Sequence, residues 1–306
     1  MVQINHKLTS LGRELETTSN ALGQLAVNND LLNDSNGLRQ QIQEQGYLFF
    51  RGFFDRDQVM AVRDFMCRKL NTAGLLDPDY PAIEAIRRPE TNIRLTPNLA
   101  DNNPKLMRLL YSGSMIDVYH RLLGGPVRHF DYTWCRTISP GHGTKPHCDA
   151  VYMGRGTPRL YTSWTPIGDA SYEDGGLMVM EQSHRIDRLR DHYCRKDVDS
   201  VCSNRKTENG SMKKKDPNFG ALTYDPVGLR RNLGLRWLTT EYEAGDLVIS
   251  TIHTVHGSLD NHGARIRLST DSRYQRADEP ADDRWISIHG KPPTKHGENS
   301  QRKMIC

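Results

Sequence analysis

The last third of the sequence alternates turn-forming segments with apolar, β-branched ones. Residues 242–246 are rich in turn formers, and residues 247–252 form an apolar run that is typical of a buried strand. A second turn-rich segment, 257–263, precedes a strand-like segment over 264–274. This spacing predicts two antiparallel strands joined by a hairpin turn.

The register of this hairpin would decide which polar side chains meet. If the turn is centred on residues 261–262, His256 and Arg267 lie opposite each other on one face of the sheet. The same parity places Ser258 and Ser269 on that face. An arginine beside serine hydroxyls can bind a distal carboxylate through a charge-assisted fork. A shift of one residue would remove this arrangement, because it turns every side chain to the other face.

Three residues have the side chains of a metal site. His147 and Asp149 are two residues apart, so on a strand they would share a face while Cys148 points the other way. Together with the distal His256 they offer two imidazoles and one carboxylate. This set occupies one face of an octahedron and is typical of non-haem Fe(II) oxygenases, whereas a structural zinc site needs a fourth protein ligand.

Other residues compete for these roles. A His-x-Asp step followed by a later histidine arises readily by chance in a chain with 12 histidines, so the neighbouring motifs have to support it. His253 is the nearest rival of His256, but three residues along a strand place it on the opposite face. Arg273 is the alternative to Arg267 as the cation that holds a carboxylate.

Several short motifs, in order and spacing, resemble those of the phytanoyl-CoA 2-hydroxylase-like Fe(II)/2-oxoglutarate dioxygenases. They are Pro146-His147-Cys148-Asp149, Ser163-Trp164-Thr165-Pro166, Glu173-Asp174-Gly175-Gly176-Leu177, Gly245-Asp246, His256-Gly257-Ser258 and Arg267. The resemblance covers roughly residues 44–285. It implies a mainly β fold with helical cover, built on a double-stranded β-helix, or cupin-like jelly-roll, core.

The resemblance also implies roles for individual residues. The iron ligands would be His147, Asp149 and His256. Arg267 would bind the C5 carboxylate of 2-oxoglutarate, with Ser258 and Trp164 lining that pocket. The implied reaction uses Fe(II), 2-oxoglutarate and O2 to hydroxylate, or otherwise oxidise, an unactivated C–H bond of a small molecule, with release of succinate and CO2.

Composition sets limits on partners and location. The net charge of +4 over 306 residues is mild and dispersed, which argues against nucleic acid as a partner. The N-terminus lacks the apolar segment of a signal peptide, and no apolar run reaches the length of a membrane span, so we expect a cytoplasmic protein. The six cysteines lack paired spacing and should be reduced thiols.

Local patterns predict the helices and the first strand. Leucine periodicity around residues 8–15 and 31–38 indicates cover helices. Residues 47–52 should form a short strand, after which Asp55 should cap a helix. A single amphipathic helix is expected over 104–123.

We expect one dioxygenase domain over residues 1–306. Its parts would be a helical cover with a short strand (1–123), the jelly-roll core (124–184 and 238–276), a lid-like insert (185–237) and a C-terminal tail (286–306).

The insert also bears on the substrate. Residues 185–215 hold ten Lys or Arg against five Asp or Glu, which favours an anionic small molecule over a neutral one, although an uninvolved surface loop explains the same excess. Further candidates for substrate contacts are Arg136, Tyr152 and Trp237. Two other functions stay open: a jumonji-like protein-modifying oxygenase, and a metal-binding pseudo-enzyme that acts as a scaffold. The sequence gives no indication of oligomeric state.

Overall fold

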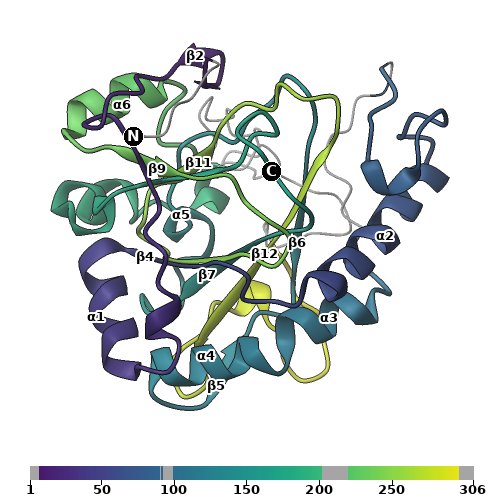
Figure 1. Cartoon of the computed structure of the whole chain (residues 1–306). Coiled ribbons are helices and arrows are strands. Elements are labelled where there is room, and N and C mark those ends of the chain that lie inside the picture. Colours follow the sequence, from purple (N-terminus) through teal and green to yellow (C-terminus); the bar gives the residue numbers. More distant parts are fainter. Residues whose placement is uncertain (1–6, 90, 92–98, 202–219, 296–306) are drawn as a thin grey trace, which may run out of the picture.

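The computed structural model describes residues 7–89, 91, 99–201 and 220–295, which form two main β-sheets with helices against the larger one (Figure 1). In this part of the chain the larger sheet has six strands in the order β4-β10-β7-β12-β5, and β6 also pairs with β12. All its pairings are antiparallel. The strands are β4 (Tyr47–Phe50), β5 (Val127–His129), β6 (Trp134–Ile138), β7 (Tyr161–Pro166), β10 (Leu247–Thr251) and β12 (Arg267–Arg276).

The smaller sheet has four strands in the order β11-β8-β9-β3 within the described residues. They are β3 (Leu22–Gln24), β8 (Leu177–Met180), β9 (Trp237–Thr239) and β11 (His256–Ser258). Apolar side chains of both sheets, including Phe49, Trp164, Val179 and Leu238, form one buried cluster. The two sheets therefore pack against each other through their inner faces.

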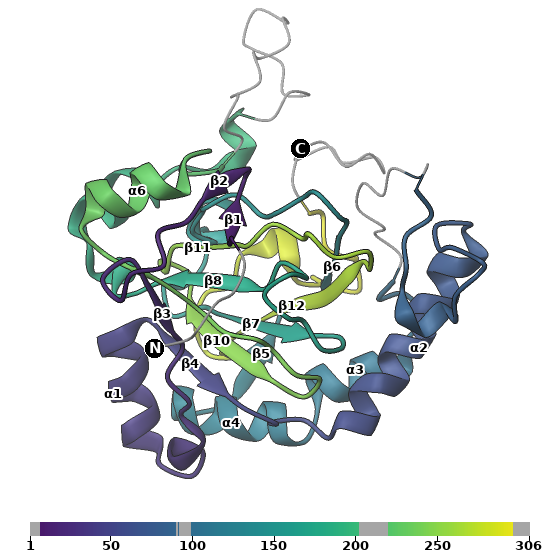
Figure 2. The same cartoon turned by 45° about the horizontal axis from the view of Figure 1, so that its top comes forward.

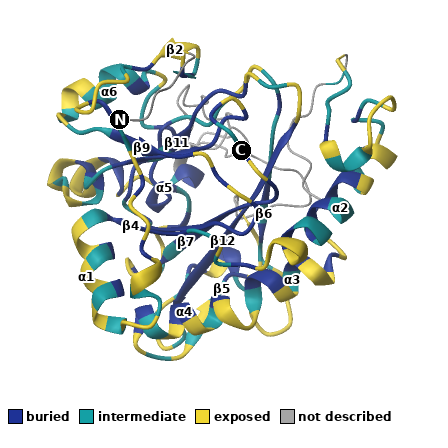
Figure 3. Ribbon diagram, in the orientation of Figure 1, coloured by how far each residue is buried: buried dark blue, intermediate teal, exposed yellow. Residues whose placement is uncertain are grey.

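Helices cover the outer face of the larger sheet (Figure 2). They are α1 (Ser35–Gln45), α2 (Arg56–Thr72), α3 (Pro104–Tyr111) and α4 (Ser114–Leu123). Their buried residues form one cluster with Leu48 and Phe50 of β4 and with Leu247 and Ile249 of β10. Figure 3 shows the result, with buried strands inside and helices exposed on their outer sides. The expected strand at 47–52 and the expected helical cover are confirmed for this part.

The structure confirms one helix prediction and corrects another. Asp55 caps α2 as expected, since its carboxylate accepts a hydrogen bond from the backbone N–H of Gln58 over 2.9 Å. The single helix over 104–123 is wrong. The chain breaks between α3 and α4, where Ser112 is extended and Gly113 has a φ of 56° that glycine adopts at little cost.

The helix expected around residues 8–15 is also wrong, because this segment forms a small antiparallel pair. Its strands are β1 (Thr9–Ser10) and β2 (Arg13–Glu14). The carboxylate of Asp260 accepts hydrogen bonds from the backbone N–H groups of Leu11 and Gly12, and the Ser10 hydroxyl donates to the Ser258 carbonyl. These tertiary contacts override the weak helical periodicity.

The predicted hairpin between residues 247–252 and 264–274 is wrong as well. β10 and β12 belong to the same sheet, but both pair with β7 and not with each other. β11, which follows β10, pairs with β8 in the smaller sheet. The turn after it therefore carries the chain from one sheet to the other, and Asn261 stabilises this crossing because its side-chain amide donates to the carbonyls of Ile138 and Arg265, each over 2.8 Å.

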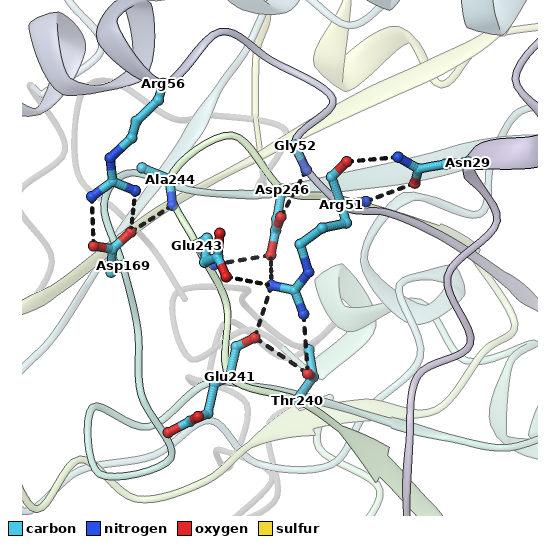
Figure 4. A network of polar contacts seen from close by, with 10 residues as sticks. All are labelled: Asn29, Arg51, Gly52, Arg56, Asp169, Thr240, Glu241, Glu243, Ala244 and Asp246. Carbon is cyan, nitrogen blue, oxygen red and sulfur yellow. Dashed lines mark hydrogen bonds and ion pairs between the residues drawn. The ribbon is translucent and has the colours of Figure 1, made fainter.

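A network around Asp246 fixes the start of β10 (Figure 4). This buried carboxylate accepts hydrogen bonds from the Arg51 guanidinium at 2.6 Å and from the backbone N–H groups of Gly52 at 3.0 Å and Glu243 at 2.9 Å. At Gly245, where φ is 113°, a side chain would meet the Phe54 carbonyl oxygen at 2.6 Å. The Gly245-Asp246 motif thus ties the turn before β10 to the end of β4.

Short helices fill the connections. They are η1 (Asn29–Leu31), η2 (Ala82–Glu84), α5 (Ala150–Met153), η3 (Ser183–Arg185), η4 (Leu189–Tyr193), η5 (Val198–Val201), α6 (Pro226–Leu233) and η6 (Asp283–Trp285). Among the described helices, none has both the length and the apolar character that crossing a membrane requires.

Candidate active site

The ligand atoms of His147, Asp149 and His256 lie within 4.8 Å of one another. Asp149 Oδ1 is 3.7 Å from His147 Nε2 and 3.9 Å from His256 Nε2. Ligand atoms bound to one metal at right angles lie about 3 Å apart, given bonds of roughly 2.1 Å. The two Asp149 distances would have to shorten by about 1 Å or less, and the separation of the two imidazole nitrogens by up to about 2 Å, to bring all three onto a metal ion.

The backbone places the two histidines directly opposite each other. His147 and His256 exchange two hydrogen bonds, N–H to carbonyl in each direction and both 2.9 Å long. Gly257 allows the close approach, because a side chain there would meet the Thr144 carbonyl oxygen at 2.9 Å. This explains why glycine follows the distal histidine.

Asp149 reaches the site by a different route from the one predicted. His147 forms an isolated bridge, and Asp149 already has helical dihedral angles (φ −66°, ψ −22°) at the N-cap of α5. A strand-to-helix turn, and not strand parity, brings the two side chains together. Cys148 does point elsewhere, since its thiol donates to the His253 carbonyl over 3.3 Å.

Both imidazoles are oriented by the backbone. His147 Nδ1 lies 2.7 Å from the Lys145 carbonyl oxygen, and His256 Nδ1 lies 3.1 Å from that of Thr254. A proton on each Nδ1 leaves the Nε2 lone pairs free for a metal. Burial, followed by the proximity of His256, lowers the pKa of His147 to about 3, so this ring is neutral and ready to bind a metal at neutral pH.

Asp149 is buried and ionised. Burial by itself would raise its pKa, but the charge of Arg273, the two histidines and a hydrogen bond from Thr162 outweigh burial and hold the pKa below its usual range. Arg273 Nη2 donates to Asp149 Oδ2 over 3.0 Å, and the Thr162 hydroxyl donates to the same oxygen. Oδ1 thus faces the imidazoles, whereas Oδ2 faces the protein.

Arg267 is a buried cation held by neutral groups. Its Nε donates to the Gly175 carbonyl over 3.1 Å, and its Nη1 donates to the Ser269 hydroxyl over 2.6 Å. Its guanidinium carbon lies 5.6 Å from the centre of the Trp164 ring. Burial lowers the pKa of Arg267 to about 10, which still leaves it charged at neutral pH. A buried charge bound only to neutral oxygens is well suited to an anionic ligand.

The two serines are placed differently. Ser269 contacts Arg267, whereas the Ser258 hydroxyl accepts from the Thr144 N–H and donates to the Leu259 carbonyl, both over 2.8 Å. Arg267, Ser269 and Asp271 all lie on the inward face of β12. The predicted hairpin does not bring Arg267 and Ser269 together. They meet because residues two apart on one strand point to the same face.

The substrate candidates separate into two groups. Arg136 has a side chain that is 32% exposed and pairs with Asp271 over 2.8 Å, and the Tyr152 ring lies edge-on to His147 with 5.5 Å between ring centres. Both lie near the proposed metal. Trp237 does not fit its expected role: it is 1% exposed and its indole N–H donates to the Pro226 carbonyl over 3.1 Å, so it is a core residue.

Three further predictions concern His253, the cysteines and the basic insert. His253 lies outside the group that His147, Asp149 and His256 form among the described residues. Cys67, Cys135, Cys148 and Cys194 are buried free thiols, and Cys202 and Cys306 lie outside the described residues. The lysines at 213–215, on which the charge argument for the insert depended, lie outside the described residues.

Sequence reasoning missed the groups that hold Asp149. Arg273 was considered only as a rival of Arg267, and Thr162 was not considered. A signal was present in the alternation of β12, where the odd-numbered residues are all polar and all buried: Arg267, Ser269, Asp271, Arg273 and Gln275. A continuous polar row on the inner face of a strand marks a binding site.

A mainly β fold that gathers two imidazoles, one carboxylate and a buried arginine defines the class of non-haem, metal-dependent oxygenases. The family model for phytanoyl-CoA dioxygenase (PhyH) matches residues 42–269, and the chain belongs to this family. It is accordingly a 2-oxoglutarate-dependent dioxygenase that uses iron.

The chain is similar to known proteins in sequence and in fold. The 1-deoxypentalenic acid 11-beta-hydroxylase of Streptomyces exfoliatus is 25% identical over 264 residues, which cover 81% of this chain and 83% of that protein. EctD from S. alaskensis, solved with 2-oxoglutarate and 5-hydroxyectoine, superimposes with a TM-score of 0.56 at 14% identity, covering 99% of this chain and 95% of that one. The epimerase SnoN from nogalamycin biosynthesis, in complex with Fe3+, alpha ketoglutarate and nogalamycin RO, gives 0.55 at 17% identity, covering 86% and 94%.

Proposed function

We propose that this protein hydroxylates an unactivated C–H bond of a small molecule, with iron held by His147, Asp149 and His256. The observation that carries the proposal is the convergence of three ligand atoms within 4.8 Å, each oriented by a further hydrogen bond. The two packed β-sheets and the helical cover of the larger one support the jelly-roll core that the family implies.

The 2-oxoglutarate anchor in this proposal is Arg267. Its guanidinium is buried, charged and hydrogen-bonded to neutral oxygens, so a C5 carboxylate would complete its partners. Trp164 would form one wall of this pocket, and Ser269 and Ser258 would supply hydroxyls. Of these two, Ser269 is already in contact with Arg267.

The protein itself would orient the substrate and exclude water from the site. Fe(II) and 2-oxoglutarate, when bound, would supply the oxidising power by coupling O2 activation to decarboxylation, which yields succinate and CO2. The imidazoles and Asp149 would occupy one face of the metal and leave the opposite face for ligands. The apolar residues around the site would keep water from the reacting carbon.

Arg136 and Tyr152 are the proposed substrate contacts. Arg136 is partly exposed and near the metal-binding residues, so it could pair with a carboxylate of the substrate. The similarity to a hydroxylase named for 1-deoxypentalenic acid supports an acidic substrate. The enzyme class, rather than a protein-modifying jumonji-like activity or a scaffold, is favoured by the family and by the intact ligand set.

Substrate-stimulated turnover tests this proposal. Purified protein with Fe(II), 2-oxoglutarate, ascorbate and O2 is incubated with a panel of carboxylic acids and their matched methyl esters, and succinate is quantified. We expect succinate above the uncoupled background for particular acids, loss of this signal in Asp149→Ala, and weaker stimulation by the esters. Succinate formation that persists in Asp149→Ala would rule out this metal site.

A further inference from the structure

We propose that Arg273, assisted by Thr162, is a positioning residue that limits Asp149 to one metal-binding oxygen. This inference rests on the metal site proposed above and assigns a task to two residues that neither bind the metal nor contact 2-oxoglutarate in that proposal. The inference is based on the different partners of the two Asp149 oxygens.

The two oxygens of Asp149 face different partners. Oδ1 points to the Nε2 atoms of both imidazoles, at 3.7 and 3.9 Å. Oδ2 accepts hydrogen bonds from Arg273 Nη2 and from the Thr162 hydroxyl. A carboxylate oxygen has two lone pairs in the carboxylate plane, and these two donors use both. Oδ2 therefore has no lone pair left for a metal.

Arg273 is itself held rigidly. It is 1% exposed, and its guanidinium carbon lies 4.1 Å from the centre of the Trp134 ring, which in turn packs on Trp285 with ring centres 4.7 Å apart. In the sheet, Arg273 is paired with Thr162 of β7. Neighbouring strands thus present both donors to the same oxygen, and rotation of Asp149 would break two contacts at once.

The hydrogen bonds of Arg273 differ from those of a purely structural arginine. Arg284, which is also buried, donates from Nε, Nη1 and Nη2 to aspartates. Arg63 donates from the same three nitrogens to carbonyl oxygens. In contrast, Nε and Nη1 of Arg273 are buried without a hydrogen-bond partner among the described residues, and the nearest carboxylate oxygen to Nη1, Asp271 Oδ2, is 3.9 Å away, at the limit of an ion pair. Leaving donors unpaired costs stability, so the position of this arginine is better explained by its task at Asp149.

One-oxygen binding matters because the metal has six positions. In the proposed site, two imidazoles, one carboxylate oxygen and the two chelating oxygens of 2-oxoglutarate would fill five of them and leave one for O2. If Asp149 bound through both oxygens, no position would be left. Arg273 and Thr162 would therefore preserve the open position without touching the metal.

Cobalt binding to the apoprotein tests this without turnover. Co(II) is titrated anaerobically into wild type, Arg273→Gln, Arg273→Lys and Thr162→Val, with and without 2-oxoglutarate, and affinity and visible absorption are recorded. We expect Co(II) affinity to fall about 10- to 100-fold in Arg273→Gln, the range typical of residues that orient metal ligands. We also expect its spectrum with 2-oxoglutarate to shift to that of a higher coordination number. Arg273→Lys and Thr162→Val should show smaller changes in the same direction.

Arg63→Gln is the matched control, since it removes a buried arginine that lies outside the site. It should lower the melting temperature but leave the Co(II) affinity and spectrum as in wild type. If folded Arg273→Gln matches wild type in both readouts, the proposal is wrong. If that variant does not fold, Thr162→Val decides, and an unchanged affinity and spectrum there would equally overturn it. If instead the proposed metal ligands are wrong, wild type would bind Co(II) no better than Asp149→Ala.

Discussion

Arg267 and Ser269 lie two residues apart on the inner face of β12, and Arg267 Nη1 donates to the Ser269 hydroxyl over 2.6 Å. Arg267 is 4% exposed, and this contact holds one edge of its guanidinium while the Gly175 carbonyl holds another. An arginine oriented by neutral groups in this way is prepared to receive a carboxylate with little loss of side-chain entropy.

Replacing Arg267 should weaken 2-oxoglutarate binding. Loss of a charge-assisted fork in a buried site costs about 2–5 kcal/mol, so Arg267→Ala should raise the KM for 2-oxoglutarate by about 30-fold or more. Arg267→Lys keeps the charge without the fork and should be impaired less. Steady-state kinetics at varied 2-oxoglutarate measures both. The exposed neighbour Arg265 provides the control: Arg265→Ala should leave this KM as in wild type, and an unchanged KM in Arg267→Ala would mean that another cation binds the carboxylate.

The two histidines near the distal motif should differ in metal binding. His256→Ala removes a side chain from the ligand group and should abolish tight binding of Fe(II) or Mn(II). His253→Ala leaves that group intact, so its metal affinity should stay within about threefold of wild type. Calorimetric titration of the apoproteins measures both values. The reverse ranking of the two variants would transfer the ligand role to His253.

Asp246 should contribute more to stability than an exposed ion pair of the same network (Figure 4). Asp246→Ala removes the acceptor of two buried backbone N–H groups and the nearest carboxylate partner of Arg51, which should lower the free energy of unfolding by about 2–4 kcal/mol. Arg56→Ala breaks an ion pair whose side chains are about half exposed and should cost about 0–1 kcal/mol. Urea unfolding compares the two. Equal losses would contradict the role assigned to Asp246.

In addition to His147, two histidines outside the metal-binding group should make stability depend on pH. Burial lowers the pKa of His184 and of His253 from the ordinary 6.5, and nearby arginines add to the effect. Because the folded state binds their protons less readily than the unfolded chain, their neutral forms are favoured in the fold. Stability is therefore complete above pH 6.5 and is lost as pH falls from there towards the folded-state pKa values. Urea unfolding at pH 7.5, 6.5 and 5.5 measures the loss.

Replacing both histidines with Gln should reduce this dependence. The exposed His120 on α4 provides the control, and His120→Gln should retain the pH profile of wild type. A double variant with an unchanged profile would exclude His184 and His253 as its source.

Much of the local structure followed from the sequence. The apolar run that became β10, the strand at β4 and the cap at Asp55 each depend on neighbouring residues, and these predictions are confirmed. The helix break at Gly113 and the pairing of residues 9–14 were missed. The first depends on a single backbone conformation, and the second on contacts with Asp260, some 250 residues away in the chain.

The sequence by itself determined which side chains could form the site: His147, Asp149, His256 and Arg267 were identified from residue type, order and spacing. Only the tertiary structure decided how they meet. Strand parity and a hairpin were the wrong routes, because a strand-to-helix turn brings in Asp149 and a crossing between sheets separates His256 from Arg267. Arg273 became visible as the partner of Asp149 only there. The sequence specifies the type and order of the side chains. The neighbours of a buried charge, however, come from strands that are distant in sequence, and packing sets their positions.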